Sequence, residues 1–216
     1  MLRVLLRAWI GLDWPGLAGI RRGSGRDGIR LGQAGIVAAL IVLNGPPAVG
    51  KSTIARMYAD NHPLALRIDI DDVRDWLGGW RQAPHAAGLR ARALATALAR
   101  DHLQAGLDVV VAQLYGHANH LDELEVTAGE LGANYHEIVL MSDLASTRER
   151  FKQRGGPRLQ EAFEAPNGLD VIVDLHQRVE ALARDRPQAT VVASTANDID
   201  ATYAAVLSAL DHTPDA

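Results

Sequence analysis

The chain has 216 residues, of which 48% are hydrophobic and 22% are charged. This composition is that of an ordinary globular domain, which excludes a disordered, collagen-like or coiled-coil chain as a whole. There is no cysteine, so disulfides, thiolate catalysis and zinc-thiolate sites are excluded. The longest apolar run, Ile36–Leu43, is far shorter than the roughly 20 residues that cross a bilayer. We therefore expect a cytoplasmic protein without a membrane segment.

The formal net charge of -4 conceals two regions of opposite sign. Residues 1–36 carry six arginines and two aspartates, a net charge of +4, whereas the rest of the chain has a net charge of -8. The first region is rich in glycine and has no sustained apolar period, which predicts a poorly ordered basic extension. Three explanations stay open: translated upstream sequence, since Val37 can be encoded by the alternative start codon GUG; a true flexible tail; or an Arg-rich transit peptide, although serine is scarce. We expect one folded domain at 37–211 and a short tail at 212–216.

Strands and helices alternate beyond residue 36. Short apolar segments predict strands at 38–43, 64–69, 108–113, 135–141 and 189–193. Longer segments with helical spacing or helix-ending glycines predict helices at 51–60, 71–77, 84–105, 118–131, 143–154, 169–184 and 198–210. Alternation of this kind predicts an α/β fold with a five-stranded parallel sheet and helices on both faces.

The segment Gly45–Ser52 matches the pattern G-x-x-x-x-G-K-[ST] (Walker A) between a predicted buried strand and a predicted helix. In this context the backbone N–H groups of the loop surround a phosphate, and the positive end of the helix dipole favours the same anion. The lysine reaches the β- and γ-phosphates, and the serine hydroxyl binds Mg²⁺. The sequence thus predicts a site for ATP and Mg²⁺ formed by Gly45, Pro46, Pro47, Ala48, Val49, Gly50, Lys51, Ser52 and Thr53.

A second charged cluster, Asp69-Ile70-Asp71-Asp72-Val73-Arg74, ends the second predicted strand and opens a helix. Ligands of open α/β sheets bind at the carboxyl ends of the strands, so we expect Asp69 to face the phosphate loop. Asp71 and Asp72 lie where a helix favours carboxylates, as a cap or as first-turn acids. Arg74 can pair with Asp71 at helical spacing or hold an anionic substrate.

Together these two motifs resemble the P-loop kinases that phosphorylate a hydroxyl group, within the AAA-family ATPases and predicted kinases. The D-x-D-x-x-R run is similar to that of adenylylsulfate kinases and polynucleotide 5′-kinases. Gluconate and shikimate kinases, zeta toxins and chloramphenicol phosphotransferase belong to the same broad group. The resemblance implies that Asp71 accepts the proton of the substrate hydroxyl and that Arg74 binds the substrate. It implies that Asp69 holds a Mg²⁺-bound water or contacts the substrate. Asp69 and Asp72 remain the alternatives to Asp71 as the base.

The end of the third predicted strand departs from this group. Such kinases often have an aspartate there as a second Mg²⁺ anchor, whereas this chain has Gln113. Because a neutral amide cannot supply that charge, either Asp69 takes the role or Gln113 contacts the substrate. The alternative is that Gln113 is only a polar strand end.

Four arginines follow the fourth predicted strand, and Arg150 and Arg154 share one face of the predicted helix 143–154. Guanidinium groups stabilise the charge of a transferred phosphoryl group, and P-loop kinases carry such arginines in a mobile lid at this point. We therefore expect a small arginine-bearing lid, the alternative being a solvated basic face. Arg148 and Arg158 are the other two members.

Two further groups are weaker candidates for the substrate pocket. Trp76 and Trp80 flank Gly78-Gly79 near the acidic helix, and His117 and His120 follow the third strand. The two tryptophans either form one wall of the pocket or pack in the core. The two histidines either line the pocket or bind a metal ion, for which no third ligand is evident.

The sequence therefore predicts a three-layer P-loop kinase that transfers the γ-phosphate of Mg-ATP to a hydroxyl of a small molecule. A nucleic-acid partner is disfavoured by the net charge of -8 beyond residue 36. The alternatives are a polynucleotide 5′-kinase-like enzyme and an ATPase or nucleotide-binding protein without such an acceptor. The predicted catalytic residues are Lys51, Asp71, Arg150 and Arg154, and Arg150 is also expected to bind ATP. The residues expected to bind the acceptor are Asp69, Asp71, Arg74 and Gln113. Those expected to bind Mg²⁺ are Ser52 and Asp69.

Overall fold

The computed structural model describes residues 37–154, 170–195 and 198–211. The strands are β1 (Ala39–Asn44), β2 (Leu66–Asp69), β3 (Val109–Ala112), β4 (Asn134–Met141) and β5 (Ala189–Ala193). The helices are α2 (Lys51–Asn61), α3 (Ile70–Asp75), α4 (Pro84–Gln104), α5 (Asn119–Leu131), α6 (Leu144–Arg154), α8 (Asp170–Asp185) and α9 (Ile199–Asp211), with a 3-10 helix η1 (Trp80–Gln82). The predicted extension at 1–36, the tail at 212–216 and the segment 155–169 of the predicted lid lie outside the described residues.

All five strands run parallel in one sheet of order β2-β3-β1-β4-β5. Leu43 of β1 pairs with Ala112 of β3 and with Ile138 of β4, and Ala112 in turn pairs with Asp69 of β2. The carboxyl ends of β2, β3 and β1 are therefore level with one another. This register brings the residues that follow each of these strands to one edge of the sheet.

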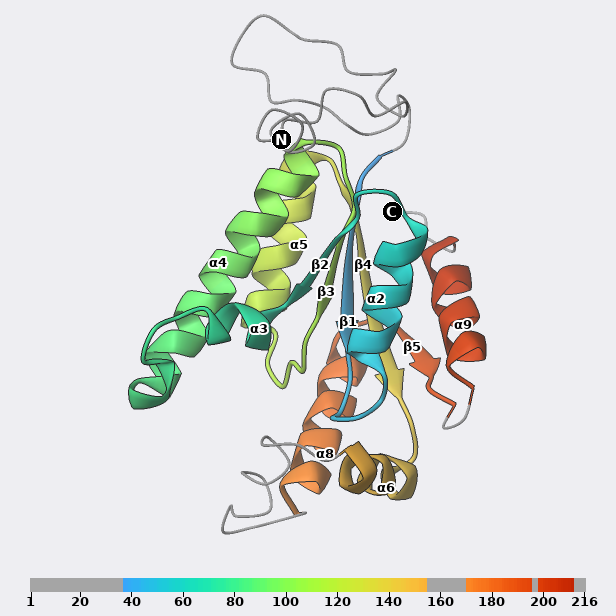
Figure 1. Ribbon diagram of the computed structural model, residues 1–216. Coiled ribbons are helices and arrows are strands. Elements are labelled where there is room, and N and C mark those ends of the chain that lie inside the picture. The colour runs from blue at the N-terminus through green and yellow to red at the C-terminus, as the bar shows by residue number, and fades with distance from the viewer. Residues whose placement is uncertain (1–36, 155–169, 196–197, 212–216) are drawn as a thin grey trace, which may run out of the picture.

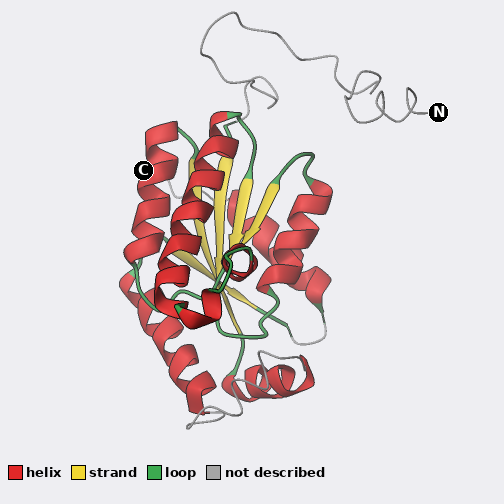
Figure 2. Cartoon of the chain, turned by 60° about the vertical axis from the view of Figure 1, so that its left-hand side comes forward, coloured by secondary structure: helices red, strands yellow, loops and turns green. Residues whose placement is uncertain are grey.

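Helices cover both faces of the sheet, as Figures 1 and 2 show. Side chains alternate along β1, so that Leu40 and Val42 face one core cluster while Ile41 and Leu43 face the other. The first cluster is completed by α3, α4, α5 and α8, and the second by α2 and α9. The predicted three-layer α/β fold with a five-stranded parallel sheet is confirmed.

The predicted element bounds differ from the observed ones by at most two residues. The second strand begins at Leu66 and not at Leu64, because Leu64 has a left-handed backbone with φ of 64° that a strand does not accommodate. The helix predicted at 71–77 spans Ile70–Asp75, because Asp69 caps its first turn. The 3-10 helix η1 was not predicted. Within the described ranges, no helix has both the length and the apolar character needed to span a bilayer.

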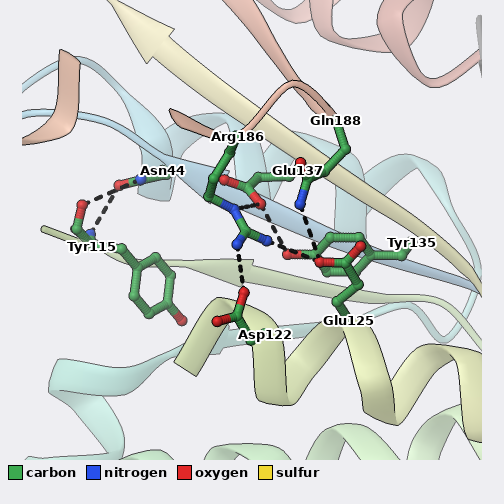
Figure 3. A network of polar contacts seen from close by, with 8 residues as sticks. All are labelled: Asn44, Tyr115, Asp122, Glu125, Tyr135, Glu137, Arg186 and Gln188. Atoms are coloured by element: carbon green, nitrogen blue, oxygen red, sulfur yellow. Dashed lines mark hydrogen bonds and ion pairs between the residues drawn. The ribbon is translucent and has the colours of Figure 1, made fainter. Parts of the chain in front are cut away.

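A buried ion network ties β4 to α5 and to the turn between α8 and β5 (Figure 3). The guanidinium of Arg186 donates from Nε to Glu137 Oε2 at 2.7 Å, and its terminal nitrogens donate to Asp122 and to Glu125. The Tyr135 hydroxyl also donates to Glu137 Oε2, at 3.3 Å. Burial raises the pKa of Glu137, although the Arg186 guanidinium acts in the opposite direction. Burial alone would lower the pKa of Arg186, but the hydrogen bonds to Glu137 and Asp122 outweigh it and raise the pKa.

Candidate phosphate-binding and transfer site

The loop between β1 and α2 has a backbone that only certain residues tolerate. Gly45 has φ of 148°, and a Cβ at this position would lie 2.4 Å from the carbonyl oxygen of Leu140. Gly50 caps α2 with φ of 97°. Ala48 adopts φ of 61°, a left-handed conformation that is costly for a residue with a side chain. The fully buried Val49 anchors the loop in the core, so the loop is held in a fixed, strained shape.

The polar side chains at the start of α2 point back to this loop and to the neighbouring strand. The Lys51 ammonium donates to the carbonyl oxygens of Gly45 (2.8 Å) and Pro46 (2.7 Å). The Ser52 hydroxyl donates to Asp69 Oδ2 at 3.2 Å. The sequence expectation that Asp69 faces the phosphate loop agrees with this geometry.

Asp69 joins the loop to α3. Its Oδ1 accepts a hydrogen bond from the backbone N–H of Asp71 at 3.0 Å, so that Asp69, and not Asp71, is the helix cap. Asp71 lies in the first turn and forms an ion pair with Arg74, whose Nη1 is 3.1 Å from Asp71 Oδ1. One chain of contacts thus runs from Ser52 through Asp69 to Asp71 and Arg74.

Asn44 fixes the phosphate loop to the loop that follows β3, and the sequence analysis did not single it out. Its side chain is fully buried. Its Oδ1 accepts from the backbone N–H groups of Gly45 (2.7 Å) and Tyr115 (2.9 Å), and its Nδ2 donates to the Tyr115 carbonyl (Figure 3). The signal available in the sequence was an asparagine as the last residue of an otherwise apolar strand. Gln113 lies in the same loop, half-buried, with its backbone N–H bonded to the Leu43 carbonyl.

Arg150 of α6 is connected to the phosphate loop through Ser194. Its Nη1 donates to Ser194 Oγ at 3.1 Å and its Nη2 to the Ser194 carbonyl at 3.3 Å. The Ser194 hydroxyl donates in turn to the carbonyl of Val49 at 2.8 Å. Ser194 directly follows β5, so the helix with the predicted arginines is tied through this residue to the loop. Sequence analysis missed Ser194, because a lone serine after a strand carries no distinctive pattern.

The remaining candidates have different surroundings. Arg154 ends α6, but its side chain lies outside the described residues, as does Arg158. His120 of α5 is buried and bonds the hydroxyls of Thr96 in α4 and of Tyr115, so it packs in the core between these segments. Burial lowers the pKa of His120. Trp76 is 68% exposed, and Trp80 lies under the Arg74 guanidinium, 4.3 Å from the ring centroid.

The arrangement suits the binding of a polyphosphate and a divalent cation. Backbone N–H groups at the start of α2, the helix dipole and the lysine supply positive potential at one point. Ser52 and Asp69 provide a hydroxyl and a carboxylate 3.2 Å apart, which are oxygen donors of the kind that Mg²⁺ prefers. These residues therefore fit a magnesium ion bound beside a phosphate.

A phosphate loop after the central strand of a parallel sheet, with a carboxylate on a nearby strand, defines a P-loop protein of the kinase type. A family model described as an AAA domain matches residues 40–182. Because this match covers more than half of the chain, the chain belongs to that family. No curated protein matches the sequence significantly.

Solved structures share the fold at low sequence identity. A proposed kinase from Chloroflexus aurantiacus has a TM-score of 0.58 at 17% identity, covering 82% of this chain and 98% of that one. A gluconokinase from Sinorhizobium meliloti has a TM-score of 0.51 at 17% identity, covering 83% and 99%. A chain of the Pnkp1/Rnl/Hen1 RNA repair complex has a TM-score of 0.59 at 19% identity, covering 70% of this chain and 47% of that one. At these identities the likeness establishes the fold alone.

Proposed function

We propose that this protein is an ATP-dependent kinase that transfers the γ-phosphate of Mg-ATP to a hydroxyl of a small molecule. The observation that carries the proposal is the chain of contacts from Ser52 through Asp69 to Asp71 and Arg74. These contacts connect the end of the phosphate loop, where a γ-phosphate would lie, to the carboxylate of Asp71 and the guanidinium of Arg74 in α3. Phosphoryl transfer requires that juxtaposition of donor and acceptor.

The residues of the phosphate loop have the nucleotide roles in this proposal. The backbone of Gly45–Thr53 surrounds the phosphates, and Lys51 leaves its two carbonyl acceptors to bind the β- and γ-phosphates. Ser52 and Asp69 would hold Mg²⁺, directly or through water, and an ion bound there would neutralise charge on the phosphate oxygens. Arg150, and Arg154 after it, neutralise the transferred phosphoryl group.

The acceptor side has a base, a binding residue and a polar contact. Asp71 accepts the proton of the attacking hydroxyl, and Arg74 orients both Asp71 and the acceptor. The neutral amide of Gln113 cannot replace an anionic metal ligand. We therefore give Gln113, in the loop after β3, the other role, which is to contact the acceptor. Asp69 is then the carboxylate that supports the metal at this edge of the sheet.

The first test measures transfer of labelled phosphate from ATP to sugars, nucleosides, aminoglycosides, nucleotide sugars and short oligonucleotides. Lys51→Ala is expected to abolish transfer and to weaken ATP binding, while Arg56→Ala, at an exposed position of the same helix, leaves both unchanged. A Lys51→Ala variant that turns over ATP like the wild type would refute the phosphate site.

The second test separates the candidate bases. Asp71→Asn keeps the shape of the side chain but removes the proton acceptor, so we expect unchanged ATP binding and a loss of transfer of about 10²–10⁴-fold. Asp72→Asn changes the neighbouring, exposed carboxylate and is the matched control. The role given to Asp71 is contradicted if Asp71→Asn loses less than about tenfold in transfer, or if Asp72→Asn loses more than Asp71→Asn does.

A further inference from the structure

Ser194 contacts two parts of the proposed phosphate site at once. It directly follows β5, and its backbone N–H donates to the Met141 carbonyl at 2.7 Å, which fixes its main chain against the end of β4. The residue is buried. Its hydroxyl donates to the carbonyl of Val49 in the phosphate loop and accepts a hydrogen bond from Arg150 of α6. One hydroxyl thus joins the loop to the helix that carries the predicted arginines.

The first of these bonds sets the direction of a peptide group in the loop. The Ser194 hydroxyl oxygen lies 2.8 Å from the Val49 carbonyl oxygen. In a planar trans peptide the C=O and the N–H point in opposite directions, so a Val49 carbonyl turned toward Ser194 turns the Gly50 N–H away from it. Gly50 caps α2, and backbone N–H groups at a helix start have no partner within the helix and can bind an anion. The bond therefore orients one of the donors that we expect to bind phosphate.

The second bond fixes Arg150 and leaves it able to bind an anion. Its Nη1 and Nη2 donate to the hydroxyl and the carbonyl of Ser194, at 3.1 and 3.3 Å. A guanidinium has five N–H donors, so this contact uses two of them. The Nε of Arg150 is buried and has no hydrogen-bond partner among the described residues. Arg150 is thus held in one orientation while it keeps donors for an oxyanion.

The two bonds made by the hydroxyl support each other. Hydrogen bonds in a chain polarise one another, so a hydroxyl that accepts from a cation donates more strongly. Arg150 therefore strengthens the bond from Ser194 to Val49, and that bond in turn fixes the hydroxyl that Arg150 contacts. An alanine at position 194 would keep the backbone carbonyl for Arg150 but would lose both bonds of the hydroxyl.

We infer that Ser194 is a positioning residue for the nucleotide, whose hydroxyl orients the Gly50 N–H and the Arg150 guanidinium together on the phosphates of ATP. This inference rests on the proposed function for the roles of the phosphate loop and of Arg150. Ser194 acts through these two groups and does not itself bind the nucleotide. Arg150 stays bonded to Ser194 when ATP is bound, so the loop and the arginine bind the phosphates as one unit.

The experiment measures nucleotide binding by the full chain in a double-mutant cycle. Calorimetry gives the dissociation constant of a non-hydrolysable ATP analogue with Mg²⁺ for wild type, Ser194→Ala, Arg150→Gln and the double variant. We expect each single variant to bind the analogue about tenfold more weakly, because Ser194→Ala leaves a buried carbonyl unpaired and Arg150→Gln removes a charged donor. Since both act through one hydroxyl, the loss in the double variant should be smaller than the product of the single losses by about threefold or more.

Two further variants separate positioning from stability. Ser194→Thr retains the hydroxyl, so we expect it to bind the analogue within about threefold of wild type; if threonine does not fit, the cycle decides by itself. Ser208→Ala removes an exposed serine of α9 and should leave binding unchanged. Melting temperatures measured without nucleotide show whether a loss of binding follows from a loss of folding.

The inference is wrong if the cycle is additive, or if a folded Ser194→Ala protein binds the analogue as tightly as wild type. It is also wrong if Ser194→Thr melts like wild type but binds as weakly as Ser194→Ala. Because binding needs no acceptor, a failed transfer screen with a non-additive cycle would refute the kinase activity and leave the role of Ser194 standing. An additive cycle in an active kinase would refute the role of Ser194 alone.

Discussion

The buried ion pair between Arg186 and Glu137 shows how strongly stability can depend on a single side chain. Arg186 is buried and bonds three carboxylates, of which Glu137 is fully buried, Asp122 is exposed and Glu125 is partly exposed. The contribution of such a pair is asymmetric: the pair adds little over apolar residues of the same shape, but removing one partner leaves a buried charge uncompensated.

We therefore expect Arg186→Met to lower the free energy of unfolding by about 3–5 kcal/mol, measured by urea denaturation. The control is Arg178→Met, which breaks the solvent-exposed ion pair between Arg178 and Asp174 in α8 and should cost less than about 1 kcal/mol. Equal losses in the two variants would show that the buried position of Arg186 has no special weight.

The raised pKa of Glu137 predicts a pH dependence of stability. Because burial favours its protonated form in the folded state, its contribution is fully present below the unfolded-state pKa of about 4.3 and is lost as pH rises through the folded-state pKa. Glu137→Gln keeps the shape and the acceptor for Arg186 but has no charge to bury. The free energy of unfolding of this variant, relative to wild type, should therefore increase between pH 4 and pH 8. A difference that stays constant over this range would mean that Glu137 has an ordinary pKa.

At the scale of single residues, the sequence predicted what lies in contiguous motifs and missed what depends on contacts across the fold. The loop Gly45–Ser52 could be predicted because its function requires a fixed spacing, and the level ends of β1 and β2 then brought Asp69 to Ser52. Asn44 and Ser194 were missed, because their hydrogen bonds to Tyr115, Arg150 and Val49 exist only once distant segments have packed. The sequence left a cap as one alternative for Asp71; because α3 begins at Ile70, the cap is Asp69, which accepts the backbone N–H of Asp71.

At the scale of elements, replacing glycine by alanine should have opposite effects in the phosphate loop and in helix α4. Gly45→Ala places a Cβ 2.4 Å from the Leu140 carbonyl oxygen in a left-handed backbone, so we expect loss of ATP binding and destabilisation by more than about 2 kcal/mol. Gly88→Ala, inside α4 with no atom near the added Cβ, should stabilise the fold by about 0.5–1 kcal/mol. Thermal unfolding and ATP binding of the two variants test this, and an undamaged Gly45→Ala protein would contradict the tight contact.

Strands and helices were predictable within two residues because each has a simple physical signature. The strands are continuous apolar runs, since both faces of the sheet are covered, and glycines after α4 and α5 mark the helix ends. The 3-10 helix η1 was not predictable, because a helix of three residues is too short to show a periodic apolar pattern.

At the scale of the whole molecule, the number and direction of the strands followed from the alternation of elements, but their order did not. The order β2-β3-β1-β4-β5 makes β2, β3 and β1 neighbours, and with their parallel register it brings the loops after these three strands together. Sequence patterns measure burial along one strand, whereas strand order depends on which long connection crosses which face.

Net charge at this scale predicts how the protein treats nucleic acid. Residues 37–216 carry a net charge of -8, and the basic residues 1–36 add +4. A protein that neutralises several phosphates of a strand shows affinity that falls steeply with salt. We expect a variant lacking residues 1–36 to keep the melting temperature of the full chain within a few degrees, because that segment has no periodic apolar face to bury.

We expect this variant to bind single-stranded DNA or RNA no more tightly than about 10⁻⁴ M at physiological salt, within the range of non-specific contacts. Fluorescence anisotropy with labelled oligonucleotides at several salt concentrations measures both proteins. Salt-steep binding by the full chain alone would assign it to residues 1–36, whereas micromolar, salt-steep binding by the shorter variant would contradict a small-molecule acceptor and favour a polynucleotide kinase.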